Sequence, residues 1–447
     1  MDNTKFLNKI TINKLMPILI VGYFLTELFY FNNPLGSFNN FYNKIQIADY
    51  FYLIVLVVFL VKFIISKNKK DFFNFDTFEK LPLLFLFFCI LTSLFAMNGI
   101  PVSQFLKYIY LISIFYIVRN VSIEVNSFKI IINYVFYILI IYFFILFLSY
   151  LTAVISKSSN FFVMFYDNFP YVDELYRLKG GYSPTSKLLA FHLFLATIFL
   201  YMFREFFSEK KKYILLFLIF TLATLTFSRA GFVVGFLSVY VFLRLLKSRY
   251  LIYSFVPIII LSFISLEILS LLFFESNNLL FVCEQSFQPN QINQRFGWFG
   301  KEFHCNLDLN LNIYQDGYLI LKLVGINAGF DNFLFGNGLG SYDQIWISAA
   351  TENLIPSYFL NYVFPMSQST LVTLFAENGM TGLLIFMAFL FGSISKGACT
   401  FKNLDVFIMC LSLFFIILNL DIQNFRFLYF YLGIFYAYHY LNKRELI

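Results

Sequence analysis

The sequence predicts an all-α, polytopic membrane protein. Hydrophobic residues make up 60% of its 447 residues and charged residues only 13%, whereas a soluble domain contains roughly 25% charged residues. Apolar stretches of about 17–25 residues, each long enough to span a bilayer, recur along the whole chain. Because no water pairs with backbone groups inside a bilayer, runs this long and continuous indicate helices.

About twelve segments have this character, so residues 1–447 are predicted to form one integral membrane domain with about 12 transmembrane helices. The segments are 15–31, 48–66, 81–97, 102–118, 130–155, 187–206, 213–228, 230–246, 250–274, 369–394, 404–420 and 425–441. The first segment reads as a retained helix rather than a cleaved signal peptide, because it lacks a small-residue cleavage site and ends in Glu27 and aromatic residues.

The distribution of Lys and Arg predicts the orientation, because cytoplasmic connections carry the excess of positive charge. Basic residues gather in alternate connections, at 5–14, 67–80, 204–212, 244–249, 396–402 and 443–444. Both termini are therefore expected to be cytoplasmic. The net charge of +7 is spread over many short loops, which argues against nucleic acid as a partner.

The two long connections fall on the outer, periplasmic side of this topology. One covers 156–186, and the other, 275–367, is the only large extramembrane segment and is acidic on balance. Within it, residues 319–329 have apolar positions at helical spacing and predict a short amphipathic helix at the membrane interface. Cys283 and Cys305 lie in this loop, as a disulfide or as two free thiols; the pattern does not decide between them. No CxxC pair or Cys/His cluster suggests a metal.

Arg229 is the most informative single residue. It interrupts one long apolar run, TLATLTFSRAGFVVGFLSVYVF, with neutral residues for many positions on either side. A charge inside such a run costs several kcal/mol, by order of magnitude, unless an anion or water receives it. We therefore expect Arg229 to face a wet, functional cavity.

Glycines mark two further positions. FDNFLFGNGLGSYD (330–343) contains Gly336, Gly338 and Gly340, which allow the backbone to pass close to a ligand or another helix. A nucleotide site is not expected here, because no strand–helix context surrounds the glycines. FAENGMTG (375–382), at the entrance of the tenth segment, predicts a broken or re-entrant helix at the outer surface.

Four motifs in this order resemble a known family. The first two are YRLKGGYSPTSKLLA (176–190) and SRAG (228–231). The long outer loop follows, and then come FLFGNGLGSY (333–342) and LVTLFAENGMTGLLIF (371–386). The combination resembles the O-antigen polymerase and O-antigen ligase superfamily over roughly residues 170–390, with Thr185 where that superfamily usually has Asn. The resemblance implies a GT-C-type glycosyltransferase architecture in the bacterial inner (cytoplasmic) membrane.

The resemblance also implies the substrate and the partners. Such enzymes use undecaprenyl-diphosphate-linked sugar donors on the periplasmic face, among the membrane lipids, and need no nucleotide sugar, metal or other cofactor. Ligases carry a His where this chain has Gln368, and Gln cannot act as a base, so the polymerase branch is favoured. A chain-length-determining co-polymerase is the protein partner implied. Many members of that superfamily carry an Arg upstream of the glycine-rich turn, here 330–343. This chain has Tyr318 at that position, and Lys322 or Arg295 is a candidate substitute.

The chemistry requires fixed positive charge where a diphosphate leaves. Arginine suits this role because its planar fork binds phosphate through two hydrogen bonds. Arg229 is the first candidate and Arg177 the second, with Lys179 and Lys187 as further phosphate or headgroup contacts.

A carboxylate is the expected acceptor of the proton of the attacking sugar hydroxyl. The candidates are Asp316, Asp331 and Glu377. A single attack in line with the departing diphosphate predicts inversion at the anomeric carbon.

Two other functions stay open. A ligase would transfer a finished glycan to lipid A–core by the same chemistry. A flippase or transporter of lipid-linked oligosaccharides would also have many spans and an intramembrane arginine. The sequence shows no internal repeat, which makes the transporter the less favoured of these.

Overall fold

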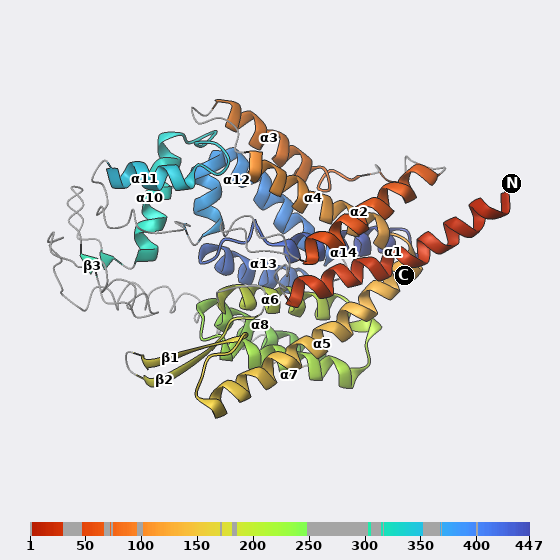
Figure 1. Ribbon diagram of the computed structural model, residues 1–447, viewed down its shortest axis with the longest axis horizontal. Helices are drawn as coiled ribbons and strands as arrows, with labels where there is room; N and C mark the ends of the chain where they lie inside the picture. The colour runs from red at the N-terminus through yellow and green to blue at the C-terminus, as the bar shows by residue number, and fades with distance from the viewer. Residues whose placement is uncertain are drawn as a thin grey trace.

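The computed structural model describes a mostly helical chain (Figure 1). It describes residues 2–29, 47–66, 72, 75–95, 102–169, 172–180, 186–247, 303–304, 314–315, 317–351, 367, 369–398 and 401–447. The helices of the first half are α1 (Asp2–Phe29), α2 (Ile47–Ile65), α3 (Leu81–Phe95), α4 (Val102–Ser122), α5 (Val125–Ser156), α6 (Ser186–Met202), α7 (Glu209–Leu225) and α8 (Arg229–Leu245), with a 3-10 turn, η3 (Arg204–Phe206). Those of the second half are α10 (Gly317–Asp331), α11 (Tyr342–Thr351), α12 (Thr370–Gly397), α13 (Asn403–Leu418) and α14 (Arg426–Lys443).

Eleven of the twelve predicted apolar segments coincide with a helix, and the remaining one, 250–274, lies outside the described residues. In the part of the chain that the structure describes, four helices are long and apolar enough to cross a membrane: α2, α5, α12 and Gln104–Ser122 of α4. The same described ranges contain three shorter apolar helices, Leu81–Leu94, Ser186–Met202 and Asn403–Leu418. The chain is thus consistent with an α-helical membrane protein.

Among the described residues, two small antiparallel sheets interrupt the helical pattern. The prediction of an all-α chain is therefore correct only at the level of the main architecture. The strands are β1 (Val163–Phe169) with β2 (Val172–Leu178), and β3 (Phe303–His304) with β4 (Tyr314–Gln315). The first sheet is a hairpin that pairs Val163 with Leu178 and Phe169 with Val172. It forms within the predicted loop 156–186, where β-branched and aromatic residues favour strands.

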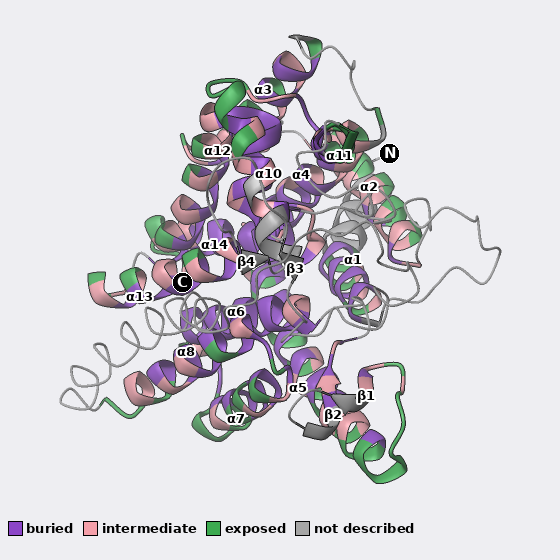
Figure 2. Ribbon diagram, turned by 90° about the vertical axis from the view of Figure 1, so that its left-hand side faces the viewer, coloured by how far each residue is buried: buried purple, intermediate pink, exposed green. Residues whose placement is uncertain are grey.

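The centre of the bundle is formed by α6 and α14, whose residues are nearly all buried (Figure 2). A helix that is apolar on all sides must be covered on all sides. Accordingly, α14 packs on α4 and α12, and α6 packs on α8. In contrast, α2 turns a row of large apolar side chains outward, among them Leu53, Val57 and Ile64, as expected of a surface that contacts lipid.

The bundle has two distinguishable ends. Both chain termini lie at one end, which we call the termini end, and the β1–β2 hairpin, α10 and α11 lie at the other, which we call the loop end (Figure 1). Because successive helices alternate in direction, α8, α12 and α14 begin at the loop end.

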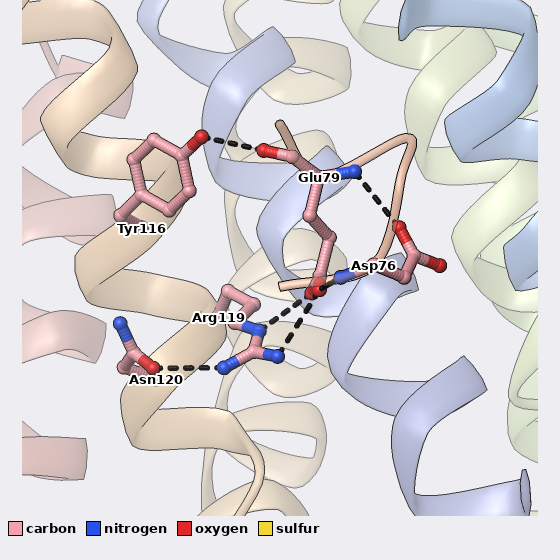
Figure 3. A network of polar contacts seen from close by, with 5 residues as sticks. All are labelled: Asp76, Glu79, Tyr116, Arg119 and Asn120. Atoms are coloured by element: carbon pink, nitrogen blue, oxygen red, sulfur yellow. Dashed lines mark hydrogen bonds and ion pairs between the residues drawn. The ribbon is translucent and has the colours of Figure 1, made fainter. Parts of the chain in front are cut away.

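A buried ion pair near the termini end ties α4 to the segment before α3 (Figure 3). The Arg119 guanidinium donates to both carboxylate oxygens of Glu79, at 2.6 and 3.2 Å. Asp76 and Glu79 bond to each other's backbone N–H groups at 2.7 and 2.8 Å, the reciprocal arrangement of a capping box. Arg119 is 1% exposed and Glu79 4% exposed, so water cannot replace either partner.

Glu79→Gln should therefore lower the free energy of unfolding by about 3–5 kcal/mol, because it leaves the Arg119 charge buried and uncompensated. Unfolding of the purified protein in detergent would measure the change. Glu124→Gln is the control: Glu124 pairs with Lys62 at 3.7 Å but is 42% exposed, so this change should cost less than about 1 kcal/mol. Equal losses for the two variants would contradict this account of the buried pair.

Candidate functional site

Two of the predicted arginines meet at the turn between α7 and α8, at the loop end. Arg177 on β2 donates from Nη2 to the Ser186 hydroxyl at 2.8 Å. The same guanidinium reaches the backbone carbonyls of Thr226 (3.5 Å) and Phe227 (3.4 Å). Arg229 is the first residue of α8, immediately after this turn. The hairpin therefore brings Arg177 to the turn from which Arg229 projects.

The SRAG motif explains the shape of this turn. Ser228 is the N-cap of α8, and its hydroxyl accepts a hydrogen bond from the Gly231 N–H at 2.9 Å, which satisfies one of the exposed donors at the helix start. The Thr226 hydroxyl lies 2.9 Å from that of Ser228, and a Cβ on residue 231 would collide with it. Phe227 has a φ of 43°, a left-handed conformation unusual for a bulky residue. These contacts together determine the conformation of the turn, and they fix the backbone of Arg229.

The electrostatic setting of Arg229 favours an anionic ligand. The free N–H groups at a helix N-terminus carry partial positive charge, so a cation there is unfavourable unless an anion accompanies it. The Arg229 side chain is half-buried, and it makes no hydrogen bond or ion pair with any residue that the structure describes. The turn at 226–228 divides the apolar run, so Arg229 lies at a helix end and not midway along a span.

Two predicted lysines flank the arginine pair in sequence. Lys179 directly follows β2, and its N–H donates to the Phe162 carbonyl at 2.9 Å. Lys187 is the second residue of α6, next to the Ser186 that receives Arg177. Both side chains are half-buried. Four cationic residues therefore lie on or next to β2, at the start of α6 and at the start of α8.

The predicted glycine turn packs against an interruption of α12. At Gly379 the backbone leaves the helical conformation, with φ 61° and ψ −171°. Gly338 N–H donates to the Glu377 carbonyl at 2.8 Å, and Met380 N–H donates to the Phe333 carbonyl at 2.7 Å. A Cβ on Gly336 would lie 2.5 Å from the Glu377 carbonyl carbon. Of the two roles expected for these glycines, the structure shows the close approach to another helix.

Glu377 lies at the junction of this turn with α11. Its carboxylate accepts hydrogen bonds from the N–H groups of Gly340 and Tyr342, so it caps the start of α11, where negative charge is favoured. Glu377 is buried, whereas Asp331 at the end of α10 is exposed. The neighbouring Asp343 side chain is exposed, but partial desolvation still raises the pKa of its carboxyl.

Lys322 contacts the connection between α13 and α14. Its Nζ donates to the Asn419 Oδ1 at 3.2 Å. The contact joins α10 to the bundle at the loop end, on the side of α12 rather than beside the hairpin.

Sequence reasoning missed two cations at the loop end. Arg426, the first residue of α14, forms ion pairs with Glu27 at 2.9 Å and with Asp49 at 2.8 Å. Lys107 lies in the second turn of α4, and Arg426 and Glu377 act on its charge. Both residues lie within or beside apolar runs, so the signal that singled out Arg229 applied to them as well.

Several predicted residues lie outside the described residues: Arg295, Asp316, Gln368, Cys283 and Cys305. In the part of the chain that the structure describes, no group of three or more His, Cys, Asp or Glu side chains could hold a metal ion.

Comparison with known proteins identifies no family for this chain. No protein-family model matches the chain, and no curated protein matches it.

Proposed function

We propose that this protein is a membrane glycosyltransferase that polymerises undecaprenyl-diphosphate-linked repeat units into O-antigen or a related surface polysaccharide. The observation that carries the proposal is the arrangement at the α7–α8 turn. Arg177 contacts this turn and Arg229 begins the helix that follows it, so fixed positive charge is concentrated at a helix N-terminus, as stabilisation of a diphosphate leaving group requires.

In the proposed reaction, the acceptor hydroxyl oxygen bonds to the anomeric carbon of the donor on the side opposite the diphosphate. The bond from that carbon to the diphosphate oxygen breaks, and its electron pair stays on the diphosphate, where Arg177 and Arg229 stabilise the negative charge. The hydroxyl proton passes to a carboxylate or to water. One displacement inverts the anomeric carbon, and no step requires a metal.

The proposed setting is a GT-C-type architecture of about twelve spans in the bacterial inner membrane, with both termini cytoplasmic. Eleven helices at the predicted positions support this count. The clusters of basic residues, such as 204–212 and 396–402, follow helices that run toward the termini end, as the positive-inside rule expects if that end is cytoplasmic. The Arg177 and Arg229 site then faces the periplasm.

Arg177→Ala should weaken binding of undecaprenyl diphosphate about tenfold to a hundredfold, because it removes charge-assisted hydrogen bonds worth about 1.5–3 kcal/mol. Equilibrium binding to the purified protein would measure this change. Binding of undecaprenol, which lacks phosphate, should be unaffected. If Arg177→Ala bound the diphosphate as tightly as the wild type, the anion site would be placed incorrectly.

Deletion of the gene in the cells that carry it tests the activity itself. Loss of a polymerase leaves single repeat units on the cell surface, and restoring the gene restores long chains. If the protein were a ligase, finished polymer would remain on its lipid carrier. If it were a flippase, single lipid-linked units would accumulate on the cytoplasmic side.

A further inference from the structure

A second polar cluster lies at the loop end, on the side of α12 rather than beside the hairpin. It is assembled from the start of α4, the first turns of α12 and the connection between α13 and α14. Its central residues are Lys107 and Glu377, which interact electrostatically. Asp421 is near enough to act on Glu377, and it accepts a hydrogen bond from the Thr373 hydroxyl at 2.8 Å.

Lys107 is the least satisfied charge of this cluster. Its side chain is half-buried and makes no hydrogen bond or ion pair within the described part of the chain. Arg426, the nearby cation, is itself held by Glu27 and Asp49. An ammonium group has three N–H donors, and in an apolar bundle their loss of water is costly unless a ligand or ordered water receives them. Lys107 is therefore a donor with unused capacity.

Glu377 supplies unused acceptor capacity beside it. Glu377 receives two backbone hydrogen bonds, from Gly340 and Tyr342, but the two oxygens of a carboxylate accept about four. The arrangement thus places hydrogen-bond donors and acceptors at one point in a chain that is otherwise apolar.

Five of the ten buried side-chain polar atoms that lack a partner in the described part of the chain belong to residues of this region. They belong to Ser341, Asn378, Gln423 and Asn424, and no described residue satisfies them. Asn378 is 0% exposed, and both polar atoms of its amide lack a partner. Buried polar groups in proteins are nearly always hydrogen-bonded, to protein, to water or to a ligand. These atoms are an observation separate from the charges of the cluster, and they leave hydrogen-bonding capacity in this region for water or a polar ligand.

We propose that the cluster around Lys107 and Glu377 binds the sugar of the acceptor substrate. Because the cluster contains both a positive group and negative groups, it favours a sugar over a second diphosphate as its ligand. Glu377 and Asp421 would repel a diphosphate, whereas a sugar hydroxyl donates to a carboxylate and accepts from an ammonium group. This inference rests on the proposed function: the arginines beside the hairpin hold the donor diphosphate, and the cluster on the α12 side holds the attacking sugar.

The test is binding of the free repeat-unit oligosaccharide, released by mild acid from the lipid carrier of the cells that make the protein. Lys107→Gln should weaken its binding to the purified protein about tenfold or more, and Lys107→Arg should retain part of it. Asp421→Asn, on a different element, should also weaken binding. Lys62→Gln is the matched control, because Lys62 is a half-buried lysine of α2 nearer the termini end, and it should bind as the wild type does.

Arg229→Ala separates this inference from the proposed function. The free oligosaccharide carries no diphosphate, so its binding should be unchanged in Arg229→Ala. The inference is overturned if the wild type does not bind the oligosaccharide, if Lys107→Gln and Asp421→Asn bind it normally, or if Arg229→Ala loses it equally. If Lys107-dependent binding is found but no sugar is transferred, the sugar site stands and the proposed function fails.

Discussion

Arg229→Ala is expected to lower the turnover of glycosyl transfer by roughly 10²–10³-fold, the effect of removing one preorganised group that stabilises transition-state charge. The expectation follows from the position of Arg229 at the start of α8, beside the turn that Arg177 contacts. Charge grows on the diphosphate oxygen as its bond breaks, so the loss should appear mainly in kcat. Turnover of a lipid-linked repeat unit by purified protein is the measurement.

Arg229→Lys should recover only part of the activity, because an ammonium group cannot make the paired hydrogen bonds of a guanidinium. The control is Arg204→Ala near the termini end. Arg204 stacks on Tyr201 at 4.6 Å and on Phe401 at 4.9 Å, and its loss should leave turnover within about twofold if it affects only local packing. Wild-type turnover in Arg229→Ala, with the protein folded, would refute the assigned role.

Gly379→Ala is expected to destabilise the fold by about 3 kcal/mol or more. Its backbone angles, φ 61° and ψ −171°, lie in a region that essentially only glycine adopts. In any other residue this conformation costs about 1–3 kcal/mol of strain. The added Cβ would also lie 2.5 Å from the Leu334 carbonyl carbon and 2.6 Å from the Gly336 nitrogen. Because those atoms are backbone, the glycine turn would have to separate from α12.

Gly235→Ala is the matched control, since it lies in the regular helix α8. A Cβ there would contact only Phe220, at 4.0 Å, and alanine is favoured over glycine inside a helix by about 1 kcal/mol. Unfolding in detergent should therefore show a large loss for Gly379→Ala and no loss for Gly235→Ala. Equal stability of the two variants would mean that the turn and α12 do not depend on this contact.

The helices were predictable because each apolar run is long and bounded by charged or polar residues. The interruption of α12 was also predictable, because Glu377, Asn378 and Gly379 break an apolar run. The partner of the glycine turn was not predictable, since glycine is equally suited to a ligand or to a neighbouring backbone. The β1–β2 hairpin was missed because its strands, of seven residues each, are too short to stand out beside apolar runs that are long enough to span a bilayer.

The candidate site could be predicted only in part from the sequence. Arg177 and Arg229 were singled out separately, and only the hairpin shows that they reach one turn. The Lys107 cluster depends on how α4, α12 and α14 pack, and these helices are far apart in the chain. No local sequence pattern predicts which side chains of such distant helices lie close together. The family resemblance and the polymerase function remain predictions.

A transfer assay with the purified protein tests the central claim most directly. The protein receives a defined undecaprenyl-diphosphate-linked repeat unit, with and without lipid A–core, and the products are separated by size. We predict a ladder of products without lipid A–core, which disappears in Arg229→Ala. A single shifted product that forms only with lipid A–core would contradict this and identify a ligase, and no product from folded protein would favour a transporter.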